Sequence, residues 1–141
     1  MLLTKWNESM TVGVKQFDRD HKRLFYMMVH LNGVLQLEDR RGQIPEGEID
    51  YAVKELEKYF RGHLFREENV MARAGYPDIE AHVEEHCHFM IRVNEISHLS
   101  TGSTSAERAR EIVQFMYEWL TRHIIVTDRK YMEFLNSKDI H

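Results

Sequence analysis

Hydrophobic residues recur along the chain at a spacing close to the roughly 3.6 residues of an α-helical turn. The pattern divides the chain into four segments, residues 18–38, 46–73, 78–99 and 105–135. Each segment repeats apolar residues at positions i, i+3, i+4 and i+7, which gives one helix face that must be buried. A leader of about residues 1–17 precedes them, and its alternating piece is too short to predict a sheet. The pattern predicts an all-α fold, an antiparallel up-down four-helix bundle with an extended N-terminal leader.

The breaks between these segments carry residues that start and end helices. We expect Asp18 to cap the first helix. Gly75, followed by Pro77, is expected to end the second helix. Thr104 and Glu107 have the spacing of a capping box at the start of the fourth.

Length and charge exclude several classes of protein. The 141 residues suit one domain, and the net charge of −4 provides no basic field for nucleic acid or anionic lipid. No apolar run is long enough to span a membrane, and the single cysteine excludes an intramolecular disulfide framework. We therefore expect a cytoplasmic protein that binds neither nucleic acid nor a membrane. The sequence does not identify a protein partner.

Six polar side chains interrupt the apolar stripes, and they occur on all four predicted helices. They are His21, His63, Glu67, His82, His86 and His123. A spacing of four residues rotates only about 40° around a helix, so His63 and Glu67 share a face, as do His82 and His86. One inward histidine is usually an ordinary core residue. Five of them with a glutamate, all needing partners away from water, predict a metal site in the bundle core.

The donor types narrow the choice of metal without deciding it. Imidazole and carboxylate ligands without thiolate suit iron, zinc, copper or manganese. One structural zinc needs only four ligands, so this set is large enough for two ions.

The same motifs resemble those of the hemerythrin family, and of bacterial single-domain hemerythrins in particular. The resemblance extends from Trp6 to about Tyr131 and covers nearly the whole chain. The motifs that carry it are Trp6…Val12-Gly13-Val14, Asp18-x-x-His21-Lys22, His63-x-x-x-Glu67-Glu68-x-x-Met71, Gly75-Tyr76-Pro77 with His82-x-x-x-His86, and Trp119-Leu120-x-x-His123-x-x-x-x-Asp128.

This resemblance implies a single hemerythrin-like domain over residues 1–141 and a non-haem centre of two iron ions bridged by an oxo or hydroxo group. The ligands of one iron would be His82, His86 and His123, those of the other His21 and His63, and Glu67 and Asp128 would bridge the pair. One coordination position, on the iron with two histidines, would be left for dioxygen. The resemblance also implies that Leu120 lines the dioxygen pocket.

Three functions fit such a site. The first is reversible dioxygen binding for storage, delivery or sensing, without enzymatic turnover. The alternatives are a di-iron redox enzyme, such as an oxidase, a peroxidase or a nitric-oxide-handling protein, and a metal-stabilised signalling module. No further acid is expected inside the ligand stripes to donate protons, and the paired Glu-x-x-His motifs of di-iron oxidases do not occur at stripe positions. Both points favour dioxygen binding over enzymatic turnover.

Several residues carry further expectations. His123 and Asp128 are five apart, about 140° around a regular helix, so both can face the site only if the helix is distorted, and we predict a π-bulge between them. Glu68 on its own is typical of a solvated charge, as is the Glu84-Glu85 pair. Cys87 is expected to be buried or half-buried.

Overall fold

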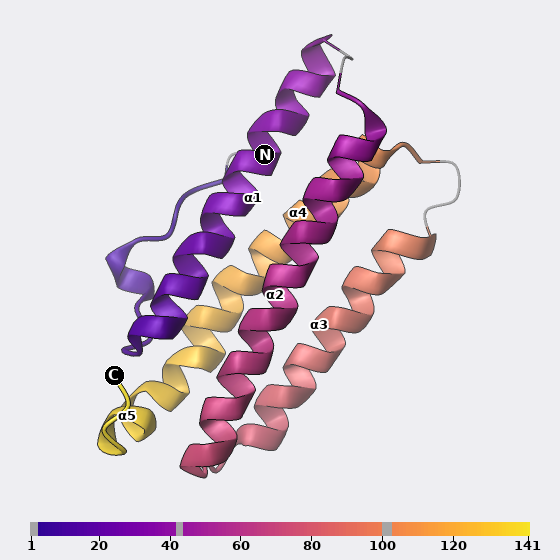
Figure 1. Cartoon of the computed structure of the whole chain (residues 1–141). Coiled ribbons are helices and arrows are strands. Elements are labelled where there is room, and N and C mark those ends of the chain that lie inside the picture. Colours follow the sequence, from indigo (N-terminus) through magenta and orange to yellow (C-terminus); the bar gives the residue numbers. More distant parts are fainter. Residues whose placement is uncertain (1–2, 42–43, 100–102) are drawn as a thin grey trace.

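The computed structural model describes residues 3–41, 44–99 and 103–141, and four long helices dominate it (Figure 1). Their bounds are α1 (Lys15–Arg41), α2 (Glu46–Ala74), α3 (Ile79–Leu99) and α4 (Ser105–Arg122). They run alternately up and down, and α4 continues through a π-helical stretch, η2 (His123–Asp128), into α5 (Arg129–Ser137). A short 3-10 helix, η1 (Glu8–Met10), lies in the leader. The described residues contain no strand, and the predicted all-α four-helix bundle is confirmed.

The predicted apolar stripes meet in one core along the bundle axis. Each long helix contributes side chains with no more than 1% exposure, among them Phe25, Phe60, Phe89 and Met116. Aromatic rings of different helices pack directly, since the Phe60 and Phe89 centroids lie 5.0 Å apart. None of the helices in the described ranges combines the length and the hydropathy that a membrane span needs.

Two of the three predicted helix ends are confirmed. At the start of α4, the Thr104 hydroxyl accepts the Glu107 backbone N–H while the Glu107 carboxylate accepts the Thr104 N–H, forming a capping box. Gly75 ends α2 with φ of 75°, a left-handed conformation that glycine adopts without steric cost.

The prediction that Asp18 caps the first helix was wrong. Helix α1 begins three residues earlier, at Lys15, and Asp18 lies inside its first turn. Its carboxylate accepts the backbone N–H of Val12 at 2.9 Å and the hydroxyl of Thr11 at 2.6 Å. Asp18 therefore fixes the end of the leader, where its charge also suits the positive end of the helix dipole.

The leader packs along the bundle and connects the N-terminal part of the chain to α4 and α5 (Figure 1). The Tyr117 hydroxyl on α4 accepts the Thr4 backbone N–H at 3.1 Å. Near the other end of the leader, the Asn136 side-chain amide on α5 donates to the Gly13 carbonyl at 2.9 Å. Gly13 has φ of 72°, and a Cβ there would overlap the Met132 side chain, so this close approach requires glycine.

The distortion predicted between His123 and Asp128 is confirmed. These two residues are the first and the last of six consecutive π-helical residues that lie between the regular helices α4 and α5. The wider turn brings two side chains five residues apart onto the face that the core requires.

Candidate metal centre

Seven polar side chains converge inside the bundle. Six of them are the residues that interrupt the apolar stripes in the sequence, and the seventh is Asp128. They are His21, His63, Glu67, His82, His86, His123 and Asp128, and none is more than 4% exposed. Their donor atoms form two groups, each with all members within 4.8 Å of one another. One group holds three histidines from α3 and η2, and the other holds two from α1 and α2. Glu67 and Asp128 belong to both groups, so the two groups share a pair of carboxylates.

The distances between imidazole nitrogens indicate that these rings are arranged around common points. The Nε2 atoms of His21 and His63 are 3.0 Å apart. Those of His86 and His123 are 3.1 Å apart, and those of His123 and His82 are 3.3 Å apart. Nitrogen ligands bound at right angles about 2.1 Å from one ion would lie about 3 Å apart. The spacing therefore fits metal ligation.

Asp128 provides a second test of whether the site fits a metal. Both of its carboxylate oxygens are buried, and neither accepts a hydrogen bond of normal geometry. Yet Nε2 of His123 lies 2.9 Å from Oδ1, and Nε2 of His21 lies 3.3 Å from Oδ2. A buried carboxylate without hydrogen bonds is costly, and coordination of a cation would remove that cost. The residues present therefore fit a metal centre with imidazole and carboxylate ligands.

Three of the five histidines are oriented from outside by a carboxylate. Nδ1 of His63 lies 3.0 Å from Oδ2 of Asp20. Nδ1 of His86 lies 2.7 Å from Glu68, and Nδ1 of His123 lies 2.8 Å from Glu85. When Nδ1–H donates to the carboxylate, the Nε2 lone pair points into the centre. Nδ1 of His21 and Nδ1 of His82 have no such partner.

Asp20 is the partner that the sequence analysis missed, and its place corrects the expectation that no further acid lies inside the ligand stripes. It is 1% exposed, beside His21 on the inner face of α1. Arg66 binds both of its oxygens, at 2.9 and 3.0 Å, and Tyr59 donates to Oδ1 at 3.0 Å. Its position three residues after buried Phe17 was a usable signal for burial.

The expectation of solvated charges is confirmed for Glu84, which is exposed, but it missed the pairings of Glu68 and Glu85 with histidines. Each is part-exposed, at 31% and 47%, but bonds a histidine on a neighbouring helix. No spacing within one helix could show these pairs, because they form between helices. The expected burial of Cys87 was wrong, since its thiol is exposed.

Tyr131 is a further buried neighbour of the centre. Its hydroxyl donates to Oε2 of Glu67 at 3.2 Å, and its ring stacks against His82 with centroids 5.7 Å apart. Burial raises the pKa of Tyr131 well above its usual value, and the charges of Asp128 and Glu67 raise it further. Tyr131 therefore stays a neutral donor.

Without a metal, the cluster is held by charge pairs. Burial lowers the pKa of His63, but the neighbouring carboxylate of Glu67 outweighs it and brings the value to about 9. For His82, burial is outweighed by Asp128 and Glu67, which raise its pKa to about 10. Conversely, burial alone would raise the pKa of Glu67, yet the adjacent imidazoles hold it well below the usual range. A metal must therefore displace protons from the histidines.

Comparison with known proteins supports this assignment of the site. A family model described as the hemerythrin HHE cation binding domain matches residues 12–135. The chain belongs to the hemerythrin family. A bacteriohemerythrin of Stenotrophomonas maltophilia is 30% identical over 94% of this chain and 82% of its own length. The hemerythrin subunit alpha of Lingula anatina is 30% identical over 89% of this chain and 90% of its own.

A solved hemerythrin structure has the same architecture. It superposes with a TM-score of 0.74 at 25% identity, over 95% of this chain and 98% of that one. A bacteriohemerythrin of Clostridium acetobutylicum is 24% identical over 91% of this chain. The bacterial relatives and the shared fold identify the chain as a bacterial hemerythrin, and the family together with the His, Glu and Asp cluster supports a non-haem iron centre that binds oxygen.

Proposed function

We propose that this hemerythrin binds dioxygen reversibly at a pair of iron ions, without catalytic turnover. The observation that carries the proposal is the pair of buried donor groups that share Glu67 and Asp128. Two groups with common carboxylates fit two adjacent ions better than one ion with spare ligands.

The ligands divide between the ions as the two donor groups do. His82, His86 and His123 would hold one iron, and His21 with His63 would hold the other. Glu67 and Asp128 would bridge them, with an oxo or hydroxo group as the third bridge. When bound, the iron pair supplies the two electrons that dioxygen uptake requires. On this division, the ion held by His21 and His63 would have fewer protein ligands, and dioxygen would bind there.

The polypeptide orients the ligands and excludes water. Asp20, Glu68 and Glu85 fix three imidazoles with Nε2 directed inward. Fully buried Leu120 lies one turn before His123 and belongs to the continuous apolar core. We propose that its side chain lines the dioxygen pocket and slows the entry of water.

The surrounding acids favour binding over turnover. The carboxylate of Asp20 is occupied by Arg66, Tyr59 and the outer nitrogen of His63. Burial raises its pKa, but the bonds to His63 and Arg66 dominate and hold it below the usual range. Asp20 therefore has no proton to deliver to a bound substrate.

An absorption series tests the proposal. The iron-loaded protein is reduced without oxygen, exposed to air and then returned to an oxygen-free atmosphere. A visible band that appears in air and disappears when oxygen is removed is the expected result. Direct and irreversible conversion to the ferric spectrum would contradict reversible binding and favour a redox enzyme. Failure to bind two irons per chain would contradict the assigned centre.

A further inference from the structure

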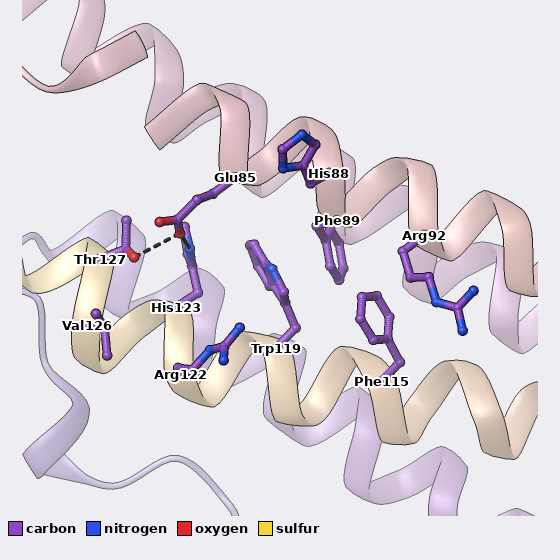
Figure 2. Close-up of a pocket in the computed structure, with 10 residues that line it drawn as sticks. All are labelled: Glu85, His88, Phe89, Arg92, Phe115, Trp119, Arg122, His123, Val126 and Thr127. Carbon is purple, nitrogen blue, oxygen red and sulfur yellow. Dashed lines mark hydrogen bonds and ion pairs between the residues drawn. The ribbon is translucent and has the colours of Figure 1, made fainter. Parts of the chain in front are cut away.

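A cleft between α3 and α4 reaches the metal centre from outside. Its volume is about 710 Å³, within the range of small-molecule sites, and it opens beside His123 and Glu85 (Figure 2). The proposed dioxygen chemistry does not use this cleft.

Stacked aromatic rings form one side of the cleft. Trp119 lies against His123 with centroids 4.2 Å apart and planes inclined by 15°. Phe89 stacks on the other side of Trp119, also at 4.2 Å, and Phe115 continues the stack at 5.6 Å. Figure 2 shows these rings rising from α4 and descending from α3 to meet in the cleft. The half-buried rings of Trp119 and Phe115 offer apolar surface for a planar ligand.

Two arginines flank these rings. Arg92 extends from α3 and Arg122 from α4 (Figure 2). Arg92 is paired with Glu95 at 3.1 Å, whereas Arg122 has no carboxylate partner among the described residues. The one carboxylate lining the cleft, that of Glu85, already accepts hydrogen bonds from His123 and Thr127, both at 2.8 Å. The exposed guanidinium of Arg122 thus lies beside half-buried aromatic rings, which suits an anionic aromatic ligand.

We propose that this cleft binds a planar heteroaromatic ring bearing a phosphate, of the reduced-flavin phosphate class, and that the ring stack ending at His123 is the entry route for its electrons. This flavin-binding proposal rests on the proposed di-iron function, and it adds a means of returning the centre to the ferrous state. The dihydroflavin is oxidised to flavin, giving up two electrons and two protons. With iron bound, each of two ferric ions would accept one of these electrons, and the protons would pass to water.

Binding is tested first, on the full-length chain loaded with redox-inert zinc, so that the result does not depend on iron chemistry. Oxidised flavin mononucleotide is titrated and its fluorescence quenching recorded. We expect saturable binding that Arg122→Gln weakens by about tenfold, since a phosphate–guanidinium contact is lost. Arg73→Gln, which removes the same charge from the exposed end of α2, is the control and should bind as the parent does.

Two partial ligands separate the ring from the phosphate. Lumiflavin, which lacks the phosphate, should bind more weakly than flavin mononucleotide and be indifferent to Arg122→Gln. Inorganic phosphate should compete poorly. No saturable binding, equal binding by Arg122→Gln and Arg73→Gln, or full competition by inorganic phosphate would each overturn the proposal.

The electron route is tested with the ferric iron-loaded protein and reduced flavin mononucleotide under anaerobic stopped flow. Trp119→Leu interrupts the stack, while Trp119→Phe retains a ring there. With equal iron content, the leucine variant should be reduced at least about tenfold more slowly than the phenylalanine variant. Equal rates would overturn the route. A chain that accepts electrons from bound flavin yet fails to bind dioxygen reversibly would overturn only the oxygen-binding proposal.

Discussion

The two halves of the metal centre are supported in different ways. In the two-histidine half, the partner of His63 is Asp20, which is buried and itself held by Arg66 and Tyr59. In the three-histidine half, His86 and His123 are oriented by Glu68 and Glu85, which are 31% and 47% exposed. In the first half, His63 is oriented by a buried carboxylate whose partner Arg66 is itself 39% exposed, and the second half is held by carboxylates in contact with water.

This difference places rigidity where the proposed function needs it. The half proposed to offer the free position for dioxygen is the one in which His63 is fixed by the buried carboxylate of Asp20. The other half borders the cleft between α3 and α4, so it is the half that lies closer to solvent.

Removing a ligand gives the largest expected effect. His123→Ala deletes a member of the three-histidine group and removes one partner each from Glu85 and Asp128. We expect loss of most bound iron, measured as iron per chain after gel filtration. His98→Ala is the control, because His98 is exposed and its hydrogen bond among the described residues is to a backbone carbonyl of its own helix. Equal iron content in the two variants would refute the ligand assignment.

The pH dependence of the metal-free and metal-loaded forms should have opposite signs. The raised pKa values of His63 and His82, about 9 and about 10, stabilise the metal-free fold fully below the unfolded value of about 6.5. That stabilisation is lost as pH rises through 9 to 10. Metal binding requires these imidazoles to lose their protons, so the affinity for iron should rise with pH over the same range.

Proton release measures this linkage directly. At pH 7, ferrous iron should displace protons from His63 in one half and His82 in the other, about two per chain, seen as buffer-dependent heats in calorimetry. Heats that do not depend on the buffer would contradict the charge-paired cluster.

Asp20→Asn tests the buried network. It leaves Arg66 without its carboxylate and replaces a charged acceptor for His63 with a neutral one. We expect a loss of about 2 kcal/mol in the free energy of unfolding of the metal-free protein, because hydrogen bonds to a buried charged carboxylate are lost, while Arg66 is 39% exposed and can be solvated. Iron affinity should fall by about 10- to 100-fold. Chemical denaturation and competition with a chelator measure the two effects.

Glu85→Gln should produce the smallest effect, and it sharpens the contrast between the halves. Glu85 is half in solvent, so a neutral acceptor there should cost less than about 1 kcal/mol of stability. If Glu85→Gln destabilises the protein as much as Asp20→Asn, the two halves are supported alike and the contrast fails.

The helical pattern made much of this structure predictable, because apolar spacing and helix ends depend on residues close in sequence. The capping box at Thr104, the left-handed Gly75 and the distortion before Asp128 are all local features. The predicted start of α1 was wrong because Asp18 accepts a hydrogen bond from the backbone of the leader. The spacing of residues along the helix could not show this contact.

The outer partners of the histidines could not be predicted in this way. Asp20 and Arg66 are 46 residues apart, and Glu85 and His123 are 38 apart. Charged residues at the edge of a helix face have the same pattern whether they meet water or a histidine of the next helix. Only the packing of the helices decides between these outcomes.

The π-helical stretch also sets what the end of the chain contributes to the core. Over such a stretch, a helix with i→i+5 bonds uses about one residue more than a regular α-helix to reach the same orientation. After it, Tyr131 and Leu135 are fully buried while Lys130 is exposed. If the same residues were wound as a regular α-helix, the last two turns would be rotated by about 100° and the ammonium group of Lys130 would point toward the interior. The widened turn is thus the spacer that allows one helix both to serve the metal centre and to close the bundle beneath it.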